Sequence, residues 1–310
     1  MQARKLKTLA AALSAAGLAL CAVQAQAQEK VKIGFITDMS SVYADVDGKN
    51  GALAIQMAID DFGGKVLGKP VELLSADHQN KPDIAASKSR EWVDTQNLTM
   101  LFAGTNSGVA LAMAKVARDT KTIMIVSNAG ANDLTGAQCS PYVFRSSFSA
   151  WQPSYAMGEA LAKKGLKNVV TVTWKYSFGE ESVAGFKEAF EKGGGKIAKE
   201  MTLPFPNVEF QPFLTEIASL KPDAVFVFFA GAGAAKFVSD YAAAGLKSSI
   251  PLYGPGFLTD GNLEAMGGAG EGLMTTLHYA DELGTERDRR FRSAYAQAYK
   301  LMPDVYAVQG

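Results

Sequence analysis

Histidine and cysteine are scarce in this sequence of 310 residues. It contains two histidines, His78 and His278, and two cysteines, Cys21 and Cys139. This scarcity argues against histidine-based catalytic triads and against metal sites with several histidine ligands. Cys139 lies in a turn-like Gln-Cys-Ser-Pro sequence, where a packed or surface thiol is commoner than a nucleophile. No Walker loop is present, so we expect no enzyme activity, no cofactor and no metal.

The sequence also lacks an excess of charge and, after residue 27, a long apolar run. Thirty-one lysines and arginines balance 31 aspartates and glutamates. A nucleic-acid-binding protein needs a basic stripe, and a membrane-surface protein needs a basic amphipathic helix. Neither pattern is found, and no later segment is long and apolar enough to cross a bilayer. We therefore expect neither a nucleic acid nor a membrane surface as a direct partner.

Residues 1–27 are predicted to form a secretory signal peptide. Three basic residues within 4–7 precede an apolar run at 9–23, and Ala-Gln-Ala at 25–27 fits a cleavage site. A lipoprotein signal ending at Cys21 is the alternative, but the bulky Leu20 before it is unfavourable. The mature protein is thus expected to begin at Gln28. It then keeps only Cys139, which excludes an intrachain disulfide.

Apolar runs alternate with segments of helical spacing through the rest of the chain. The runs are continuous and partly β-branched, as in parallel strands that are covered on both faces. We predict strands at 31–37, 71–76, 100–103, 123–126, 169–174, 197–203, 224–229, 250–253, 273–278 and 305–310. We predict helices at 48–62, 82–95, 107–119, 151–164, 180–192, 210–220, 234–244 and 287–301. These units form two series with a break near 146–151, which indicates an α/β fold with two parallel sheets.

Two of the predicted strands end abruptly in small polar residues. Residues 101–108 read Leu-Phe-Ala-Gly-Thr-Asn-Ser-Gly, and residues 123–130 read Ile-Met-Ile-Val-Ser-Asn-Ala-Gly. Ligands bind at the carboxyl ends of parallel strands, where hydroxyl, amide and N–H groups can hold a polar head group. One such loop is more often an ordinary strand–helix connection. Two of them in an exported chain favour a binding site.

Three further segments can each be interpreted in more than one way. In residues 230–236, Lys236 replaces the third glycine of a dinucleotide motif, so a tight turn is the favoured interpretation. Residues 77–80, Asp-His-Gln-Asn, are better interpreted as a polar loop than as metal ligands. Trp174, Tyr176 and Phe178 follow a predicted strand. Packing between domains and the wall of an apolar ligand pocket are equally good interpretations of these three aromatics.

The order and spacing of several segments resemble the periplasmic solute-binding proteins of ABC importers, of the branched-chain amino-acid-binding type. The resemblance is carried by residues 33–40, 51–61, the two polar loops, 143–146, 176–180, 243–247 and 272–273. It implies the type I periplasmic binding fold, with two doubly wound parallel-sheet lobes and a ligand cleft between them. Lobe 1 would comprise 28–148 and 278–310, and lobe 2 would comprise 149–277. The family's third crossover would lie beyond residue 310, so we expect the C-terminal part of lobe 1 to be missing.

The resemblance also implies a set of ligand-binding positions. Ser107 falls on the hydroxyl position of the loop that holds a ligand carboxylate. In the next loop, Asn128 and Gly130 stand where the family usually has a small residue and a threonine. Phe178 takes the place of a cleft aromatic that is often tyrosine in amino-acid binders. The complete predicted set is Tyr43, Thr105, Asn106, Ser107, Asn128, Ala129, Gly130, Phe178 and Gly256.

Gly256 bears on the identity of the ligand, because amino-acid binders often carry there a glutamate that pairs with the ligand ammonium. A buried ammonium without a counter-charge is costly. We therefore expect a small carboxylate with an apolar or aromatic body, either an amino acid or an aromatic or 2-oxo acid. The resemblance implies a periplasmic monomer that closes on its ligand and delivers it to an ABC permease in the inner membrane. A ligand-sensing receptor subunit would use the same cleft, whereas a periplasmic enzyme would need a catalytic pair that the sequence lacks.

Overall fold

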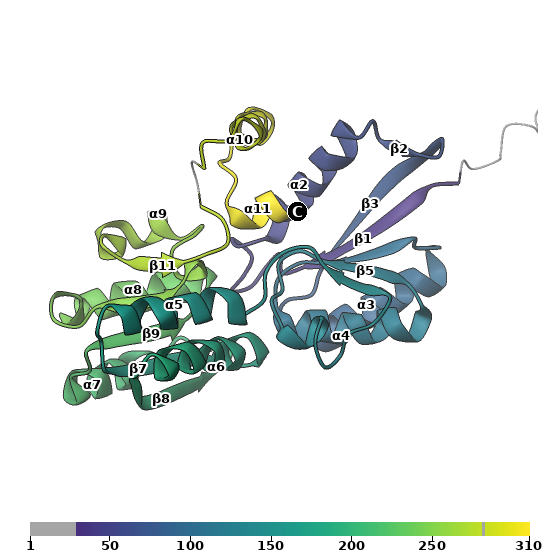
Figure 1. Ribbon diagram of the computed structural model, residues 1–310. Helices are drawn as coiled ribbons and strands as arrows, with labels where there is room; N and C mark the ends of the chain where they lie inside the picture. Colours follow the sequence, from purple (N-terminus) through teal and green to yellow (C-terminus); the bar gives the residue numbers. More distant parts are fainter. Residues whose placement is uncertain (1–28, 281–282) are drawn as a thin grey trace, which may run out of the picture.

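The computed structural model describes residues 29–280 and 283–310, so the predicted signal peptide lies outside the described residues. Two α/β units lie side by side, and the chain crosses between them near residue 150 and again before its last two helices (Figure 1). Within the described ranges, no helix is both long and apolar enough to traverse a lipid bilayer. The predicted α/β class with two mainly parallel sheets is confirmed.

The first sheet has six strands in the order β2-β3-β1-β4-β5-β6. All neighbouring pairs are parallel except β2 with β3. The strands are β1 (Val31–Thr37), β2 (Lys65–Val66), β3 (Lys69–Asp77), β4 (Met100–Ala103), β5 (Ile123–Val126) and β6 (Val143–Arg145). The helices of this unit are α2 (Gly48–Asp61), α3 (Pro82–Thr95) and α4 (Ser107–Thr120), with a short 3-10 helix η2 (Asn132–Leu134).

Successive residues of β1 explain why the first sheet is covered on both faces. The Phe35 side chain packs with Ile55 and Ile59 of α2, whereas Ile36 packs with Met113 of α4. Side chains alternate between the two faces of a strand, so an uninterrupted apolar run requires a helix layer on each side. This arrangement leaves the carboxyl ends of β1, β4 and β5 free to carry polar loops.

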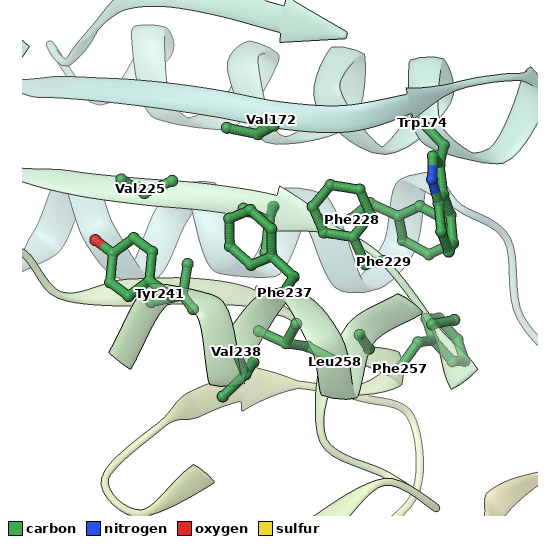
Figure 2. Packing of buried hydrophobic residues seen from close by; sticks show 14 of the residues in the cluster. Val172, Trp174, Val225, Phe228, Phe229, Phe237, Val238, Tyr241, Phe257 and Leu258 are labelled. Carbon is green, nitrogen blue, oxygen red and sulfur yellow. The ribbon is translucent and has the colours of Figure 1, made fainter. Parts of the chain in front are cut away.

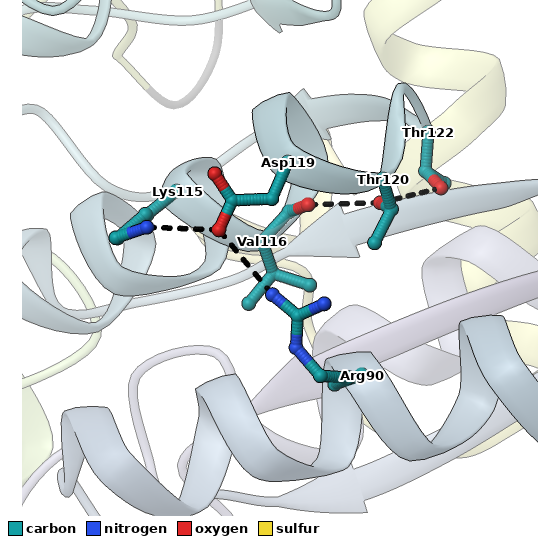
Figure 3. A network of polar contacts seen from close by, with 6 residues as sticks. All are labelled: Arg90, Lys115, Val116, Asp119, Thr120 and Thr122. Atoms are coloured by element: carbon teal, nitrogen blue, oxygen red, sulfur yellow. Dashed lines mark hydrogen bonds and ion pairs between the residues drawn. The ribbon is translucent and has the colours of Figure 1, made fainter.

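Helices α3 and α4 are also joined at the surface by a small charged network (Figure 3). Asp119 of α4 accepts from Lys115 at 2.8 Å and from Arg90 of α3 at 3.3 Å. Exposed ion pairs of this kind each contribute at most about 1 kcal/mol. They join the C-terminal end of α4 to α3, whereas the first turn of α4 faces the site described below.

The second sheet has five parallel strands in the order β11-β10-β9-β7-β8. The strands are β7 (Asn168–Lys175), β8 (Lys196–Pro204), β9 (Ala224–Phe228), β10 (Leu252–Pro255) and β11 (Met274–Thr276). The α-helices are α5 (Trp151–Lys163), α6 (Ser177–Lys192), α7 (Gln211–Leu220), α8 (Gly231–Ala243) and α9 (Leu263–Met266). The 3-10 helices are η3 (Leu246–Ser248), η4 (Gly256–Leu258) and η5 (Gly267–Gly270).

Aromatic side chains fill the core between the second sheet and α8 (Figure 2). Trp174 packs edge-on against Phe229 with ring centroids 5.0 Å apart, and Phe229 stacks on Phe237 of α8 at 4.8 Å. The Trp174 indole N–H donates to the Asn207 carbonyl at 2.7 Å, so its polar atom is satisfied. Trp174 is therefore a core residue. Of the two interpretations that the sequence left open for this aromatic, packing is the one that the structure supports.

The last described segment departs from the sequence prediction. Helix α10 (Glu286–Tyr299) matches the predicted helix, but residues 305–310 form the short helix α11 (Val305–Gln309) instead of a strand. The Asp304 side chain caps α11 by accepting from the backbone N–H groups of Tyr306 and Ala307. Residues 305–307 of this helix are buried. The expected absence of a C-terminal part of lobe 1 stays a prediction.

Candidate ligand-binding site

A small cavity lies where loops from the carboxyl ends of both sheets meet. Ligands of parallel α/β sheets bind at this end of the strands. Of the described residues that line the cavity, none carries a charge. The lining consists of Tyr43, Val46, Thr105, Asn106, Ser107, Asn128, Phe148, Tyr176, Phe178, Phe228, Ala230, Phe257 and Tyr306.

Four phenylalanine rings form one wall of the cavity. Phe178, in the first turn of α6, stacks on Phe228 with ring centroids 4.3 Å apart. It meets Phe148 and Phe257 edge-on at 6.0 and 5.4 Å. Sequence reasoning predicted Phe178 and missed the other three, because they lie far apart in the chain: Phe148 in the loop before α5, Phe228 at the end of β9 and Phe257 in η4. The rings offer flat apolar faces suited to a planar, apolar ligand body.

The loop after β4 uses two of its three polar side chains for its own structure. Asn106 has a positive φ of 75° and caps α4, accepting from the Val109 N–H at 3.1 Å. The Thr105 hydroxyl lies 3.3 Å from the Thr37 hydroxyl. The Ser107 hydroxyl is buried and has no hydrogen-bond partner among the described residues. Of the predicted trio, Ser107 is thus the side chain left to serve a ligand.

The loop after β5 divides its predicted residues between the cavity and the protein core. Asn128 lines the cavity, whereas Ala129 is buried in the core under the first sheet. Gly130 lies against the aromatic wall. A β-carbon at this position would lie 2.5 Å from Phe178 and 2.8 Å from Phe148. The glycine therefore makes room for the two rings, and a threonine here could not coexist with them.

Asp47 is a buried carboxyl group beside the cavity that sequence reasoning missed. It has no exposed surface, and it accepts from the Thr37 hydroxyl, the Thr105 N–H and the Asn128 amide at 2.8, 3.1 and 3.0 Å. Burial raises the pKa of Asp47 to about 7, although these three hydrogen bonds act in the opposite direction. A side chain at Gly104 would collide with this carboxyl group, but this close packing is visible only in the structure.

Tyr306 of α11 is a second cavity residue that was missed. Its hydroxyl is buried and has no hydrogen-bond partner within the described chain. Its carbonyl oxygen accepts from the Asn128 amide at 3.2 Å. A tyrosine close to the end of the sequence offered no motif, and residues 305–310 were predicted to be a strand. The folding of α11 against α2 brings this residue to the site.

Three contacts close the seam between the two sheets around the cavity. The hydroxyl groups of Tyr43 and Tyr176 are 2.7 Å apart. Glu181 of α6 accepts from the backbone N–H of Asn132 at 2.6 Å, and burial raises the pKa of Glu181 to about 7. At Gly231, where φ is 55°, a β-carbon would strike the carbonyl oxygen of Val42. These contacts show the two units closed over the cavity.

Gly256, the remaining predicted position, does not line this cavity. A β-carbon on Gly256 would lie 2.6 Å from the Leu277 side chain, and the residue borders a neighbouring cavity. Its neighbour Phe257 faces the aromatic wall instead. In this structure, a larger side chain at 256 would thus point toward Leu277.

The other polar candidates from the sequence do not line the cavity. His78 is buried, and its ring nitrogens lie 3.2 Å from the Thr105 carbonyl and 3.0 Å from the Asn80 N–H. Cys139 is an exposed free thiol. Across residues 29–280 and 283–310, no group of three or more metal-ligating side chains comes together. The Ala-Gly-Ala-Gly run opens α8 as a tight turn.

Two α/β units with mainly parallel sheets, and a cavity between them lined by uncharged and aromatic residues, define a binding protein of the two-lobed kind. The chain belongs to the periplasmic binding protein family, whose model matches residues 30–310. The family is one of solute-binding proteins of ABC transporters and not of enzymes. The type I periplasmic binding fold expected from the sequence is confirmed.

Relatives and solved structures agree with this family. The chain is 31% identical to a Leu/Ile/Val-binding protein homolog of Brucella melitensis over 308 residues, which is 96% of this chain and 78% of that protein. An ABC transporter solute-binding protein of R. palustris, solved with benzoate, is 44% identical with a TM-score of 0.87, covering 91% of this chain and 77% of that one. Another solute-binding protein, from Rhodopseudomonas palustris BisB5 and solved with 3,4-dihydroxybenzoic acid, is 34% identical with a TM-score of 0.85. The match covers 90% of this chain and 77% of that one.

Proposed function

We propose that this protein binds an aromatic carboxylate and delivers it to an ABC permease. The observation that carries the proposal is the chemistry of the cavity, which combines a wall of phenylalanine rings with uncharged polar groups. The ammonium of an amino acid would find no counter-charge among the residues that line the cavity, and burial without one is costly. The benzoate found in the R. palustris relative supports the same ligand class.

The site suggests which end of the ligand lies where. The N-terminal end of the 14-residue helix α4 begins at Ser107, and such an end favours negative charge. The unpartnered hydroxyl groups of Ser107 and Tyr306 are both able to donate to a carboxylate. We place the ligand carboxylate at these groups and the ring against Phe178 and its neighbours.

The remaining parts of the proposal concern the whole molecule. Residues 28–148 and 278–310 would form lobe 1 and residues 149–277 lobe 2, with closure around the ligand creating the surface that a permease recognises. Residues 1–27 would direct a monomeric protein to the periplasm. Mass spectrometry of the exported protein should find an N-terminus at Gln28, and an intact N-terminal segment would contradict this part.

The ligand class is tested by calorimetric titration of the mature protein. We expect benzoate to bind with a Kd in the micromolar range or tighter, and leucine and valine to bind at least about 100-fold more weakly, the cost of an unpaired buried charge. A 2-oxo acid with the leucine skeleton separates the effect of the amino group from that of the ring. Tight leucine binding together with no response to benzoate would refute the proposal.

Replacing Ser107 with alanine should weaken benzoate binding without destabilising the ligand-free protein. A hydrogen bond to a charged group is worth about 1.5–3 kcal/mol, which corresponds to roughly 10- to 150-fold in Kd. The free protein loses only a buried hydroxyl that has no partner within the described residues. Titration and thermal unfolding measure the two effects. S248A, at an exposed serine, is the matched control, and equal benzoate affinity in S107A and S248A would place Ser107 outside the site.

A further inference from the structure

The amide of Asn128 is held in one orientation by two acceptors. Its Nδ2 lies 3.0 Å from Asp47 Oδ1 and 3.2 Å from the carbonyl oxygen of Tyr306. An amide nitrogen carries two donor hydrogens, whereas the amide oxygen only accepts. A flipped amide would set its oxygen against two other acceptors. The surroundings therefore determine which end of the amide is Nδ2.

Asp47 is itself fixed, so it cannot turn to suit a flipped amide. Its Oδ2 accepts from the Thr37 hydroxyl and from the Thr105 N–H. The carboxyl group is packed so closely that a β-carbon at Gly51 or Gly104 would collide with it. In its ionised form, Asp47 thus presents only an acceptor to Asn128.

The other end of the amide is left for a ligand. Asn128 Oδ1 is buried and has no hydrogen-bond partner in the described part of the chain, and Asn128 lines the cavity. An acceptor buried without a donor costs stability, and a ligand that supplies the donor recovers this cost. We propose that Asp47 is a positioning residue that turns the Asn128 carbonyl oxygen toward the ligand and thereby selects aromatic carboxylates that carry a hydroxyl group. This inference rests on the proposed function.

The donor is a neutral hydroxyl rather than an ammonium. A charged donor would require a carboxylate of its own, and both oxygens of Asp47 are already occupied by three donors. The remaining lining is aromatic, aliphatic or uncharged polar. A ligand carboxylate oxygen would also be repelled by Asn128 Oδ1, since both atoms are acceptors. The hydroxyl therefore lies at Asn128 and the carboxylate elsewhere, at Ser107.

The selection is measured by titrating the mature protein with benzoate, the three hydroxybenzoates and the three methoxybenzoates. At least one hydroxybenzoate should bind about tenfold or more tightly than benzoate, because it satisfies the buried acceptor. Its methoxy counterpart, which has no donor, should not share this gain. If all hydroxybenzoates bind no better than benzoate, the inference is overturned while the proposed function stands. If no aromatic acid binds, both fail.

Asp47→Asn provides the test of the positioning role. Thr105 still requires an acceptor, so the new amide keeps its oxygen there and turns its nitrogen toward Asn128. Two donors then face each other, and the Asn128 carbonyl oxygen is no longer held toward the ligand. The ratio of hydroxybenzoate to methoxybenzoate affinity should fall at least about tenfold relative to wild type. Asp45→Asn, at an exposed neighbour, should leave the ratio unchanged. Asn128→Ala removes the acceptor and should abolish the hydroxyl advantage even if D47N folds poorly. An unchanged ratio in N128A would overturn the inference.

Discussion

Replacing Phe178 with alanine is expected to reduce benzoate affinity on the order of 100-fold and to lower the free energy of unfolding by about 3–5 kcal/mol. The ring is 5% exposed and contacts Phe148, Phe228 and Phe257. Its removal opens a hole in the wall that would face the ligand ring and detaches the first turn of α6 from that wall. Calorimetry gives the change in affinity, and urea unfolding gives the change in stability.

Two companion variants separate the ring from the general loss of volume. Phe178→Leu keeps most of the apolar volume and loses the aromatic face, so it should retain stability better than it retains affinity. Phe144→Ala removes a ring that is 52% exposed in β6 and should change neither property appreciably. Benzoate binding within about threefold of wild type in F178A would show that the aromatic wall does not contact the ligand.

The ligand-free protein is expected to become less stable as the pH rises from 5 to 8. Burial raises the pKa of Asp47, Glu181 and Asp304 to about 7 in the folded state, well above the values near 4 of unfolded carboxyl groups. The folded state therefore binds more protons between about pH 4 and 7, and this stability is lost as the pH passes through 7. At about 1.4 kcal/mol per pKa unit, the unfolding free energy should fall by at least about 2 kcal/mol.

Urea unfolding at several pH values measures this slope. His78 and His278 act against it below pH 6.5, because burial lowers the pKa of each imidazole. The side chains introduced by Asp47→Asn and Glu181→Gln do not titrate, so each substitution should reduce the change in unfolding free energy with pH. The exposed substitution Asp45→Asn should leave this pH dependence unaltered. A wild-type protein whose stability rises steadily from pH 5 to 8 would contradict the prediction.

The sequence was sufficient to predict most of the scaffold and one side of the site. Continuous apolar runs such as β1 and β9 predict buried parallel strands, and the small polar residues after β4 and β5 mark their carboxyl ends. Ser107 and Asn128 could be named from this pattern and from the family resemblance. Asn106 could be located but not assigned its role, because a helix cap and a ligand contact require the same type of residue.

Asp47 and Tyr306 could not be found in this way. Each reaches the cavity only through tertiary packing: Asp47 at the start of α2, and Tyr306 in a helix that depends on the cap supplied by Asp304. Gly256 was predicted from the family position alone, and side-chain direction depends on the local backbone that a single sequence does not reveal. Loops of both lobes line the same cavity only after the chain has folded, so their proximity cannot be inferred from the sequence.

The close approach of Gly231 to the Val42 carbonyl joins the two units beside the cavity. With no side chain between them, the two units meet at this point along their main chains. On the proposed closing mechanism, a bound molecule leaves when the lobes separate. The rate of release is then the rate of opening, and affinity differences among ligands are expected to arise mainly as differences in residence time.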